Sequence, residues 1–185
     1  GIEQFRDKVK AAGFSDLHLN AVVWGRAVLP SEGVVKNIGE LLKNLGFSST
    51  TSYVWIHHVA LPDFPQTDYA YVKEKYFAHA QKAIHEYGLP YYPNVTMGWD
   101  ASARTTAGPY ENIGYPFMAT ISGNTTEAFK AALQQMKTFL DENPSCEKIF
   151  NINAWNEWTE SSYLEPDTMN RDGYLQAIKA VFGGN

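Results

Sequence analysis

The sequence predicts an α/β fold in which four or five parallel strands alternate with helices. Stretches with apolar residues at helical spacing alternate with short apolar stretches along the 185 residues. Several helical stretches stop at a glycine, and polar residues gather just beyond the predicted strands. Strict alternation of this kind favours a parallel sheet with helices outside it.

The first half of the chain supplies two strands and two helices. Apolar residues at Ile2, Phe5 and Val9 have helical spacing, and Gly13 follows them as a stop. The expected elements are a helix over 2–12, a strand over 17–23, a helix over 33–45 and a strand over 52–59. Gly46 directly follows the second helix, where a glycine commonly ends a helix in the left-handed conformation.

The second half continues the alternation. One long helical pattern stops at Gly88 and Pro90, and another begins with a capping stretch at Thr125. The expected elements are a helix over 68–87, a strand over 95–99, a short extra strand over 117–121, a helix over 125–140, a strand over 148–155 and a helix over 172–182. We expect one domain over 1–185, because a chain of this length has room for one sizeable core.

Two architectures satisfy this order of elements: an open doubly wound sheet and part of a barrel. The polar residues gather just after the carboxyl ends of the strands, which is where barrel enzymes carry their chemistry. The pattern of elements alone does not choose between the two.

Composition limits the kinds of partner. The formal charge of −5 argues against nucleic acid, because binding a phosphate backbone relies on clustered Lys and Arg. No apolar run approaches the about 18 residues that a membrane helix needs, so we expect no membrane segment. The single cysteine, Cys146, excludes an internal disulfide and leaves the compartment open, so that a secreted or periplasmic location is compatible with it.

The segment 151–167 is the richest in chemistry, because a strand leads into a loop with two Trp and four carboxylates. Cleavage of a glycosidic bond needs one carboxyl group to protonate the leaving oxygen and a second to assist attack at the anomeric carbon. Glu157 and Glu160 are the natural catalytic pair, and flanking Trp155 and Trp158 would desolvate one of them and raise its pKa. The alternative is that both glutamates only cap the last helix or pair with lysines.

Polar and aromatic residues beyond the strands are candidates for sugar binding. Side chains alternate along a strand, so only one of His57 and His58 would enter a cavity. Trp99 would stack on a sugar ring, with an Asp100–Arg104 pair that merely holds the loop as the alternative. The expected substrate-binding residues are Trp24, His57, His58, Trp99, Asp100, Arg104, Asn153, Trp155, Asn156 and Trp158.

The sequence predicts neither a metal nor a cofactor. The two adjacent histidines lack a third and a fourth ligand at recognisable spacing, and the sequence has no paired Cys and no His-Glu-Xaa-Xaa-His segment. It also has no Gly-rich phosphate loop, so nucleotide binding has no support in the sequence.

Several segments between about 91 and 182 resemble a known family. They are Trp99-Asp-Ala-Ser-Ala-Arg104, Thr126-Glu-Ala-Phe129, Asn153-Ala-Trp-Asn-Glu-Trp-Thr-Glu160, Leu164-Glu-Pro-Asp167 and Gly173-Tyr-Leu175. These segments resemble the WbsX family and its relatives, the endo-α-mannosidases. The resemblance implies the carboxy-terminal portion of a (β/α)₈ TIM barrel whose two motif glutamates carry catalysis.

The resemblance also implies a mechanism. Glu157 would assist the sugar 2-hydroxyl in attacking its own anomeric carbon, and Glu160 would be the general acid and then the base, with retention of configuration. Two departures stand out: Ser161 replaces the usual Gly, and the region before Leu17 contains none of the amino-terminal barrel strands. Because proteins avoid long exposed strand edges, we expect either a fragment or a homo-oligomer in which two copies complete the barrel.

Three functions are compatible with these observations. The leading hypothesis is a glycoside hydrolase that cleaves an α-linked, mannose-containing glycan or polysaccharide. The first alternative is a glycosyltransferase of polysaccharide biosynthesis, which would use the same glutamates on a sugar donor. The second is a carbohydrate-binding barrel fragment without turnover.

Overall fold

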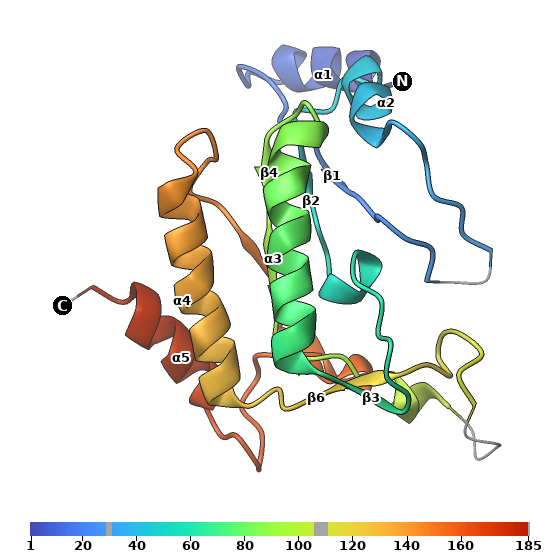
Figure 1. Cartoon of the computed structure of the whole chain (residues 1–185). Helices are drawn as coiled ribbons and strands as arrows, with labels where there is room; N and C mark the ends of the chain where they lie inside the picture. Colours follow the sequence, from blue (N-terminus) through green and yellow to red (C-terminus); the bar gives the residue numbers. More distant parts are fainter. Residues whose placement is uncertain (29–30, 106–110, 185) are drawn as a thin grey trace.

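The structure is a computed structural model that describes residues 1–28, 31–105 and 111–184. It is a mixed α/β structure in which parallel strands alternate with helices, as the sequence predicts (Figure 1). The strands of the central layer are β1 (Asn20–Val22), β2 (Ser49–Thr51), β4 (Tyr91–Tyr92), β5 (Asn94–Thr96) and β7 (Asn151–Asn153).

All neighbours in this layer pair in parallel. β2 pairs with β1 on one side and with β4 on the other, and β5 pairs with β7. Only Pro93 separates β4 from β5, so the two sheets follow one another along a single extended segment. The carboxyl ends of β1, β2, β5 and β7 therefore point to the same edge of the layer, where the following loops can meet.

In the described ranges the strands are accompanied by the α-helices α1 (Ile2–Ala11), α2 (Ile38–Asn44), α3 (Tyr69–Glu86), α4 (Thr126–Glu142) and α5 (Gly173–Phe182). Four of them agree closely with the predicted ranges, whereas α2 begins several residues later than expected. Side-chain caps explain two of the starts. The Asp68 carboxylate accepts hydrogen bonds from the backbone of α3, and the Thr125 hydroxyl accepts one from Ala128 N of α4.

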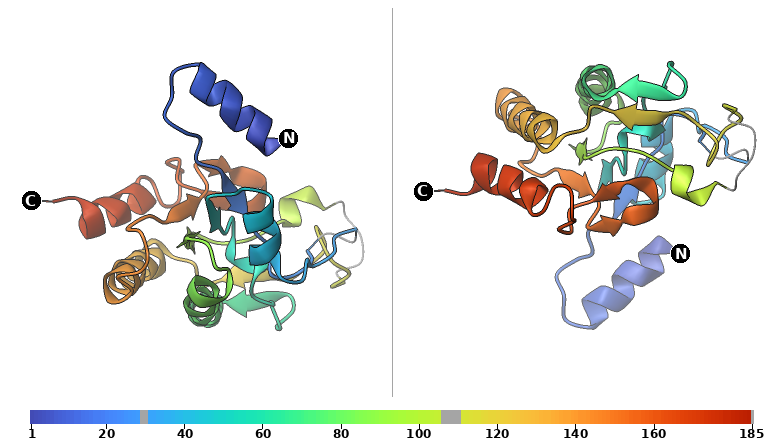
Figure 2. Two further views of the ribbon diagram at one scale, coloured as in Figure 1. Left: turned by 90° about the horizontal axis from the view of Figure 1, so that it is seen from above. Right: turned by 90° about the horizontal axis from the view of Figure 1, so that it is seen from below.

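The main core lies between the strands and helices α3, α4 and α5, which cover the outer side of the layer (Figure 2). Trp55 occupies its centre and is fully buried, with ring centroids 5.1 Å from Tyr69 and 5.4 Å from Tyr76. From the α4 side, Leu133 and Met136 are also fully buried. The spacing of apolar residues along α3 and α4 thus places one face of each helix against the strands.

The predicted second strand, over 52–59, is wrong. The structure has β2 earlier in the chain, followed by a 3₁₀ helix over Trp55–His57. Val54, Trp55 and Ile56 are all fully buried, so their apolar run resembles a buried strand in the sequence. Trp55 leaves the strand direction because its backbone N–H donates to Thr96 Oγ1 and its indole N–H donates to the Asn94 carbonyl, at 3.1 and 2.9 Å.

Two smaller strand pairs lie beyond the carboxyl ends of the central strands. β3 (Gln66–Asp68) pairs in parallel with β6 (Thr120–Ser122), which is the extra strand expected over 117–121. β8 (Asn156–Glu157) and β9 (Ser162–Tyr163) form an antiparallel hairpin that the sequence did not predict. The pairs β3–β6 and β8–β9 are thus insertions between a central strand and its following helix.

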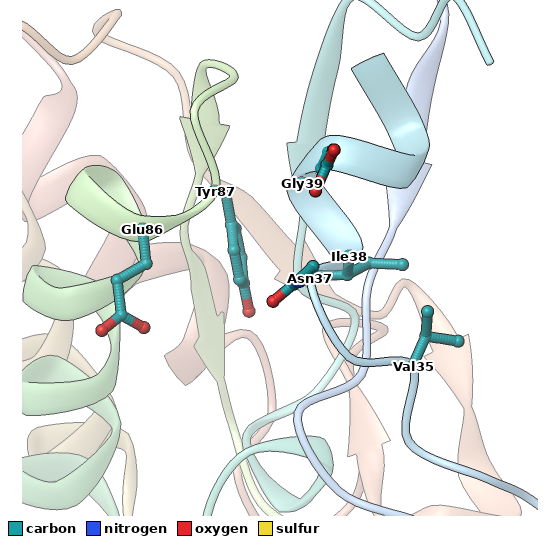
Figure 3. Close-up of a pocket in the computed structure, with 7 residues that line it drawn as sticks. Val35, Asn37, Ile38, Gly39, Glu86 and Tyr87 are labelled. Carbon is teal, nitrogen blue, oxygen red and sulfur yellow. The ribbon is translucent and has the colours of Figure 1, made fainter. Parts of the chain in front are cut away.

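The amino-terminal region is packed more loosely. None of the residues of α1 is buried, and both views of Figure 2 show this helix set apart from the rest. Arg6 connects it to the body through hydrogen bonds from Nη2 to the Gly46 carbonyl and Ser48 Oγ. Figure 3 shows the neighbouring groove between α2 and the end of α3, where Gly39 packs so closely on the Tyr87 backbone that a Cβ would lie 1.9 Å from its carbonyl oxygen.

In the described part of the chain, no helix is both long and apolar enough to cross a bilayer. The partial (β/α)₈ barrel and the single domain over 1–185 stay predictions.

Candidate functional site

The predicted site residues come from the segments that leave the carboxyl ends of β1, β2, β5 and β7. After β5 the chain forms a 3₁₀ helix over Ser102–Arg104, and after β8 it forms another over Trp158–Glu160. A backbone hydrogen bond of 2.8 Å from Asp100 N to the Glu160 carbonyl joins the two segments. Residues more than 50 positions apart are thereby brought to one site.

Arg104 contacts both predicted catalytic glutamates. Its Nη2 donates to Glu157 Oε1 at 2.6 Å, and its Nη1 lies 3.3 Å from Glu160 Oε1. Its Nε donates to Thr159 Oγ1 at 2.8 Å, and the Thr159 hydroxyl in turn donates to Glu157 Oε1 at 3.0 Å. One guanidinium therefore fixes the positions of both carboxylates. The alternatives in which the glutamates only cap a helix or pair with lysines are not what these contacts show.

The two carboxylates differ in their exposure to solvent. The side chain of Glu157 is 34% exposed, whereas that of Glu160 is 9% exposed. Burial raises the pKa of Glu160, and the nearby Glu157 charge raises it further, while Arg104 and a hydrogen bond from Tyr115 lower it. The net shift is upward, so Glu160 holds a proton more readily than an ordinary glutamate does.

Glu160 lines a cavity of about 210 Å³ whose walls are mainly aromatic. Trp24 stacks on His57 with ring centroids 3.9 Å apart, and Trp99 lies across from Tyr115 at 6.2 Å. The lining residues are Trp24, Val28, Tyr53, His57, Trp99, Tyr115 and Glu160. Three of the predicted binding residues, Trp24, His57 and Trp99, thus share this cavity with the predicted catalytic residue Glu160.

His57 and His58 have different surroundings, as expected, and only His57 lines the cavity. They lie at a 3₁₀ helix, however, and not on a strand. His57 lines the cavity, and burial lowers its pKa to about 4, so the ring is neutral at pH 7. His58 lies instead against His79, with ring centroids 4.1 Å apart, and hydrogen-bonds Ser52 Oγ through Nε2 at 2.7 Å. Burial lowers the pKa of His58 to about 2, so it too is uncharged in the fold.

Asp100, Asn153 and Asn156 lie outside the cavity wall. The Asp100 carboxylate accepts a hydrogen bond from Ser102 N at 2.8 Å, so it shapes the turn before Arg104. Asn153 is buried beneath the site, and its Oδ1 accepts a hydrogen bond from Thr96 Oγ1 at 2.7 Å. Asn156 is exposed on the hairpin.

Trp155 and Trp158 are 53% and 44% exposed, and neither lines the cavity that holds Glu160. Trp158 stacks on Tyr163 with ring centroids 3.8 Å apart, and its indole N–H donates to Glu165 Oε2 at 2.6 Å. The residues that bury Glu160 come from other segments: Tyr53, Trp99 and Tyr115.

Ser161, for which the resemblance implied a glycine, is in the left-handed conformation with φ 51° and ψ 34°. A residue with a Cβ is disfavoured there by roughly 1–2 kcal/mol. The position that directly follows Glu160 therefore carries backbone strain, which a glycine would not have.

Tyr115 and Thr159 are contact residues that the sequence reasoning did not single out. Tyr115 accepts a hydrogen bond from Arg104 Nη1 and donates one to Glu160 Oε1 at 3.3 Å. It lies in Gly114-Tyr-Pro-Phe117, between two predicted elements, where neither apolar spacing nor a charged motif marks it. Thr159 lies inside the Glu-Trp-Thr-Glu motif, and this position was the feature of the sequence that could have marked it as a site residue.

The described residues contain no group of three or more His, Cys, Asp or Glu side chains that could hold a metal ion. The contacts at Glu157 and Glu160 form a pair of carboxylates around one arginine.

Comparison with known proteins identifies relatives. Residues 2–178 match the model of a family described as Glycosyltransferase WbsX, which confirms the resemblance found in the motifs. The uncharacterized protein WxcX from two strains of Xanthomonas campestris pv. campestris is 29% identical over 99 residues. That match covers 54% of this chain but 13% of WxcX, so the chain corresponds to a small part of that protein. No solved structure matches the chain.

Proposed function

Because this chain belongs to the WbsX family, we propose that it carries the acid–base centre of a carbohydrate-active enzyme, and that the enzyme is a glycoside hydrolase acting on an α-linked glycan. The observation that carries this proposal is the unequal pair of carboxylates. Glu160 is buried and holds its proton more readily than usual, whereas Glu157 is partly exposed and bonded to Arg104. Two carboxyl groups with different environments are what acid and base roles on one glycosidic bond require.

Glu160 takes the role of proton donor. It lines the aromatic cavity, and a sugar ring seated there would bring its glycosidic oxygen near a protonated carboxyl group. As the bond from the anomeric carbon to the leaving oxygen breaks, the proton of Glu160 passes to that oxygen. In the second step Glu160, now ionised, removes a proton from the attacking water.

Glu157 takes the role of the assisting carboxylate. By resemblance to the endo-α-mannosidases, it removes the proton of the sugar 2-hydroxyl, whose oxygen bonds to the anomeric carbon of the same ring. Water then opens that three-membered ring and restores the hydroxyl, with retention of configuration. The hydrogen bonds from Arg104 and Thr159 hold Glu157 in the orientation that this step needs.

The cavity favours an uncharged sugar as the ligand. Its lining residues include no Lys and no Arg, and His57 is neutral at pH 7. A volume of about 210 Å³ is below the about 300–1,000 Å³ of drug-sized ligand sites, which suits a single ring better than a nucleotide sugar. Its aromatic walls suit the apolar face of a sugar ring.

A glycosyltransferase is the second candidate, because the family model carries that description. In that case the two glutamates would act on an activated sugar donor, and a glycan hydroxyl would take the place of water. The diphosphate of a nucleotide donor would then have to be bound outside the residues that line this cavity.

The test is turnover of α-mannosides and α-mannan oligosaccharides of each linkage in ¹⁸O-labelled water, with products analysed by mass spectrometry. Hydrolysis places one ¹⁸O at the new reducing end. Glu160→Gln should lower the rate by about 10²–10⁴-fold, which is the usual contribution of a general acid. Glu142→Gln removes the same charge at an exposed position of α4 and should leave the rate unchanged.

Full turnover by Glu160→Gln would contradict the role of Glu160 as proton donor. Sugar transfer from a nucleotide donor, with no ¹⁸O in the product, would instead establish the glycosyltransferase.

A further inference from the structure

Each of the three guanidinium nitrogens of Arg104 has a partner within the protein, although the side chain is 35% exposed. Its Nε, Nη1 and Nη2 contact the Thr159 hydroxyl, the Tyr115 hydroxyl with Glu160, and Glu157 respectively. The planar fork of an arginine suits such simultaneous contacts, which a lysine ammonium cannot reproduce. An arginine whose nitrogens all have protein partners is poorly available to a ligand.

Tyr115 extends this arrangement to the cavity. Its hydroxyl accepts from Arg104 Nη1 and donates to Glu160 Oε1 at 3.3 Å, while its ring forms part of the cavity wall. The same side chain therefore links the arginine to the buried glutamate and shapes the space beside it. A hydrogen bond donated to a carboxylate favours the ionised form of that carboxylate.

We propose that Arg104 and Tyr115 are positioning residues that set the protonation and orientation of Glu160, and that Arg104 does not bind the substrate. This inference rests on the proposed function for its importance to catalysis, but the coupling among the side chains can be measured without any substrate. It changes the role expected for Arg104 from the sequence, and it gives Tyr115 a role that the motifs did not suggest.

Every charged or titratable group that faces Glu160 enters the prediction. Burial raises the pKa of Glu160, Arg104 lowers it, Glu157 raises it, and the Tyr115 hydroxyl lowers it. Of two further cavity residues, Tyr53 titrates above this range because burial raises its pKa, whereas His57 titrates within it because burial lowers its pKa to about 4, so the His57 ring is followed in the same experiment. The groups to be considered are Arg104, Glu157, Tyr115, Tyr53 and His57.

The variants should shift the titration midpoint of Glu160 in different directions, so that each variant tests a different contact. Arg104→Met removes the positive charge and should move the titration midpoint of Glu160 to higher pH. Tyr115→Phe removes one hydrogen bond and should move it in the same direction by a smaller amount. Glu157→Gln removes a negative charge and should move it to lower pH. Arg104→Lys keeps the charge but loses the fork, so it should restore only part of the shift.

The experiment follows the carboxyl carbons of ¹³C-labelled glutamates by NMR as pH is varied, with the Glu160 signal assigned from its loss in Glu160→Gln. Amide spectra of each variant establish that it is folded. Lys130→Met and Tyr71→Phe make the same chemical changes at exposed positions of α4 and α3, and should leave the Glu160 midpoint in place.

A Glu160 midpoint that stays unchanged in both Arg104→Met and Tyr115→Phe overturns the proposal, as does a rise in Glu157→Gln. If Arg104→Met does not fold, the other two variants still decide, because each is a conservative change with its own sign. Lack of glycan turnover would count against the proposed function alone, since the titration of Glu160 does not depend on substrate.

Discussion

The two faces of the central strands are built differently. On the outer face, Ala21 and Val95 are buried beneath helices, and the surrounding core is apolar. On the inner face, Asn20 and Asn151 are exposed and Val22 is 56% exposed. The outer face therefore contributes the hydrophobic stabilisation, while the inner face leads along the strands to the candidate site.

Several polar residues of the inner face hydrogen-bond one another, whereas the buried Asn153 Nδ2 has no partner among the described residues. The Thr96 hydroxyl lies within hydrogen-bond distance of the amide oxygens of Asn94 and Asn153, at 2.8 and 2.7 Å, and Asn20 Nδ2 donates to Ser49 Oγ at 2.6 Å. The contacts Thr96–Asn153 and Asn20–Ser49 cross between strands and fix their spacing just before the site begins, whereas the contact Thr96–Asn94 lies within β5. Directional polar contacts hold geometry with little net gain in stability, so the two faces should respond differently to mutation.

The largest expected effect is on the outer face. Leu133→Ala in α4 deletes a fully buried side chain, and the resulting cavity should lower the free energy of unfolding by about 2–5 kcal/mol. Urea denaturation measures the loss. Met169→Ala, at a side chain that is 89% exposed, is the control and should change stability by less than about 0.5 kcal/mol. Equal effects at the two positions would mean that the helix layer does not carry the core.

The difference between the faces also explains what the sequence could predict. Helices α3, α4 and α5 follow from apolar spacing and capping residues, which are local signals. Glu157 and Glu160 could be recognised because two tryptophans and four carboxylates lie close together in one segment of the chain. The contact of Glu157 with Arg104 joins residues 53 positions apart, and it depends on where two irregular loops cross. No periodic pattern encodes such a crossing.

The same reason accounts for the incorrect expectations. The buried run at 54–56 matched a strand because both a strand and a fully buried turn require apolar residues. The tryptophans beside the glutamates were expected to bury them because they are neighbours in sequence. The hairpin β8–β9 instead presents Trp155 and Trp158 to solvent, and Tyr115 arrives from a distant loop.

A glycine at position 161 should remove the backbone strain at the site. Ser161 has a positive φ, so Ser161→Gly should raise the free energy of unfolding by up to about 1 kcal/mol, less the entropy that glycine gains in the unfolded chain. Thermal or urea unfolding measures this. Ser145→Gly changes a loop serine without a positive φ and should lower stability by a few tenths. A loss of stability in Ser161→Gly would show that the loop is not strained at this residue.

The smallest expected effect is the change in stability when Glu160 is replaced by glutamine. Its pKa is raised in the fold by burial, so the protonated form favours folding; this contribution is present below the unfolded-state pKa and is lost as pH rises through the folded-state pKa. At pH 7 this side chain therefore costs stability, because its ionisation is more favourable in the unfolded chain than in the fold, and glutamine has no such cost. Glu160→Gln should be slightly more stable than the parent at pH 7, by less than about 1 kcal/mol because the contact with Arg104 is lost, and the gain should disappear near pH 4. Urea midpoints at the two pH values, with Glu142→Gln as the exposed control, measure it. The opposite result would be a Glu160→Gln variant whose stability relative to the parent is lower at pH 7 than at pH 4. It would show that the Arg104 contact stabilises the fold by more than the burial of Glu160 destabilises it.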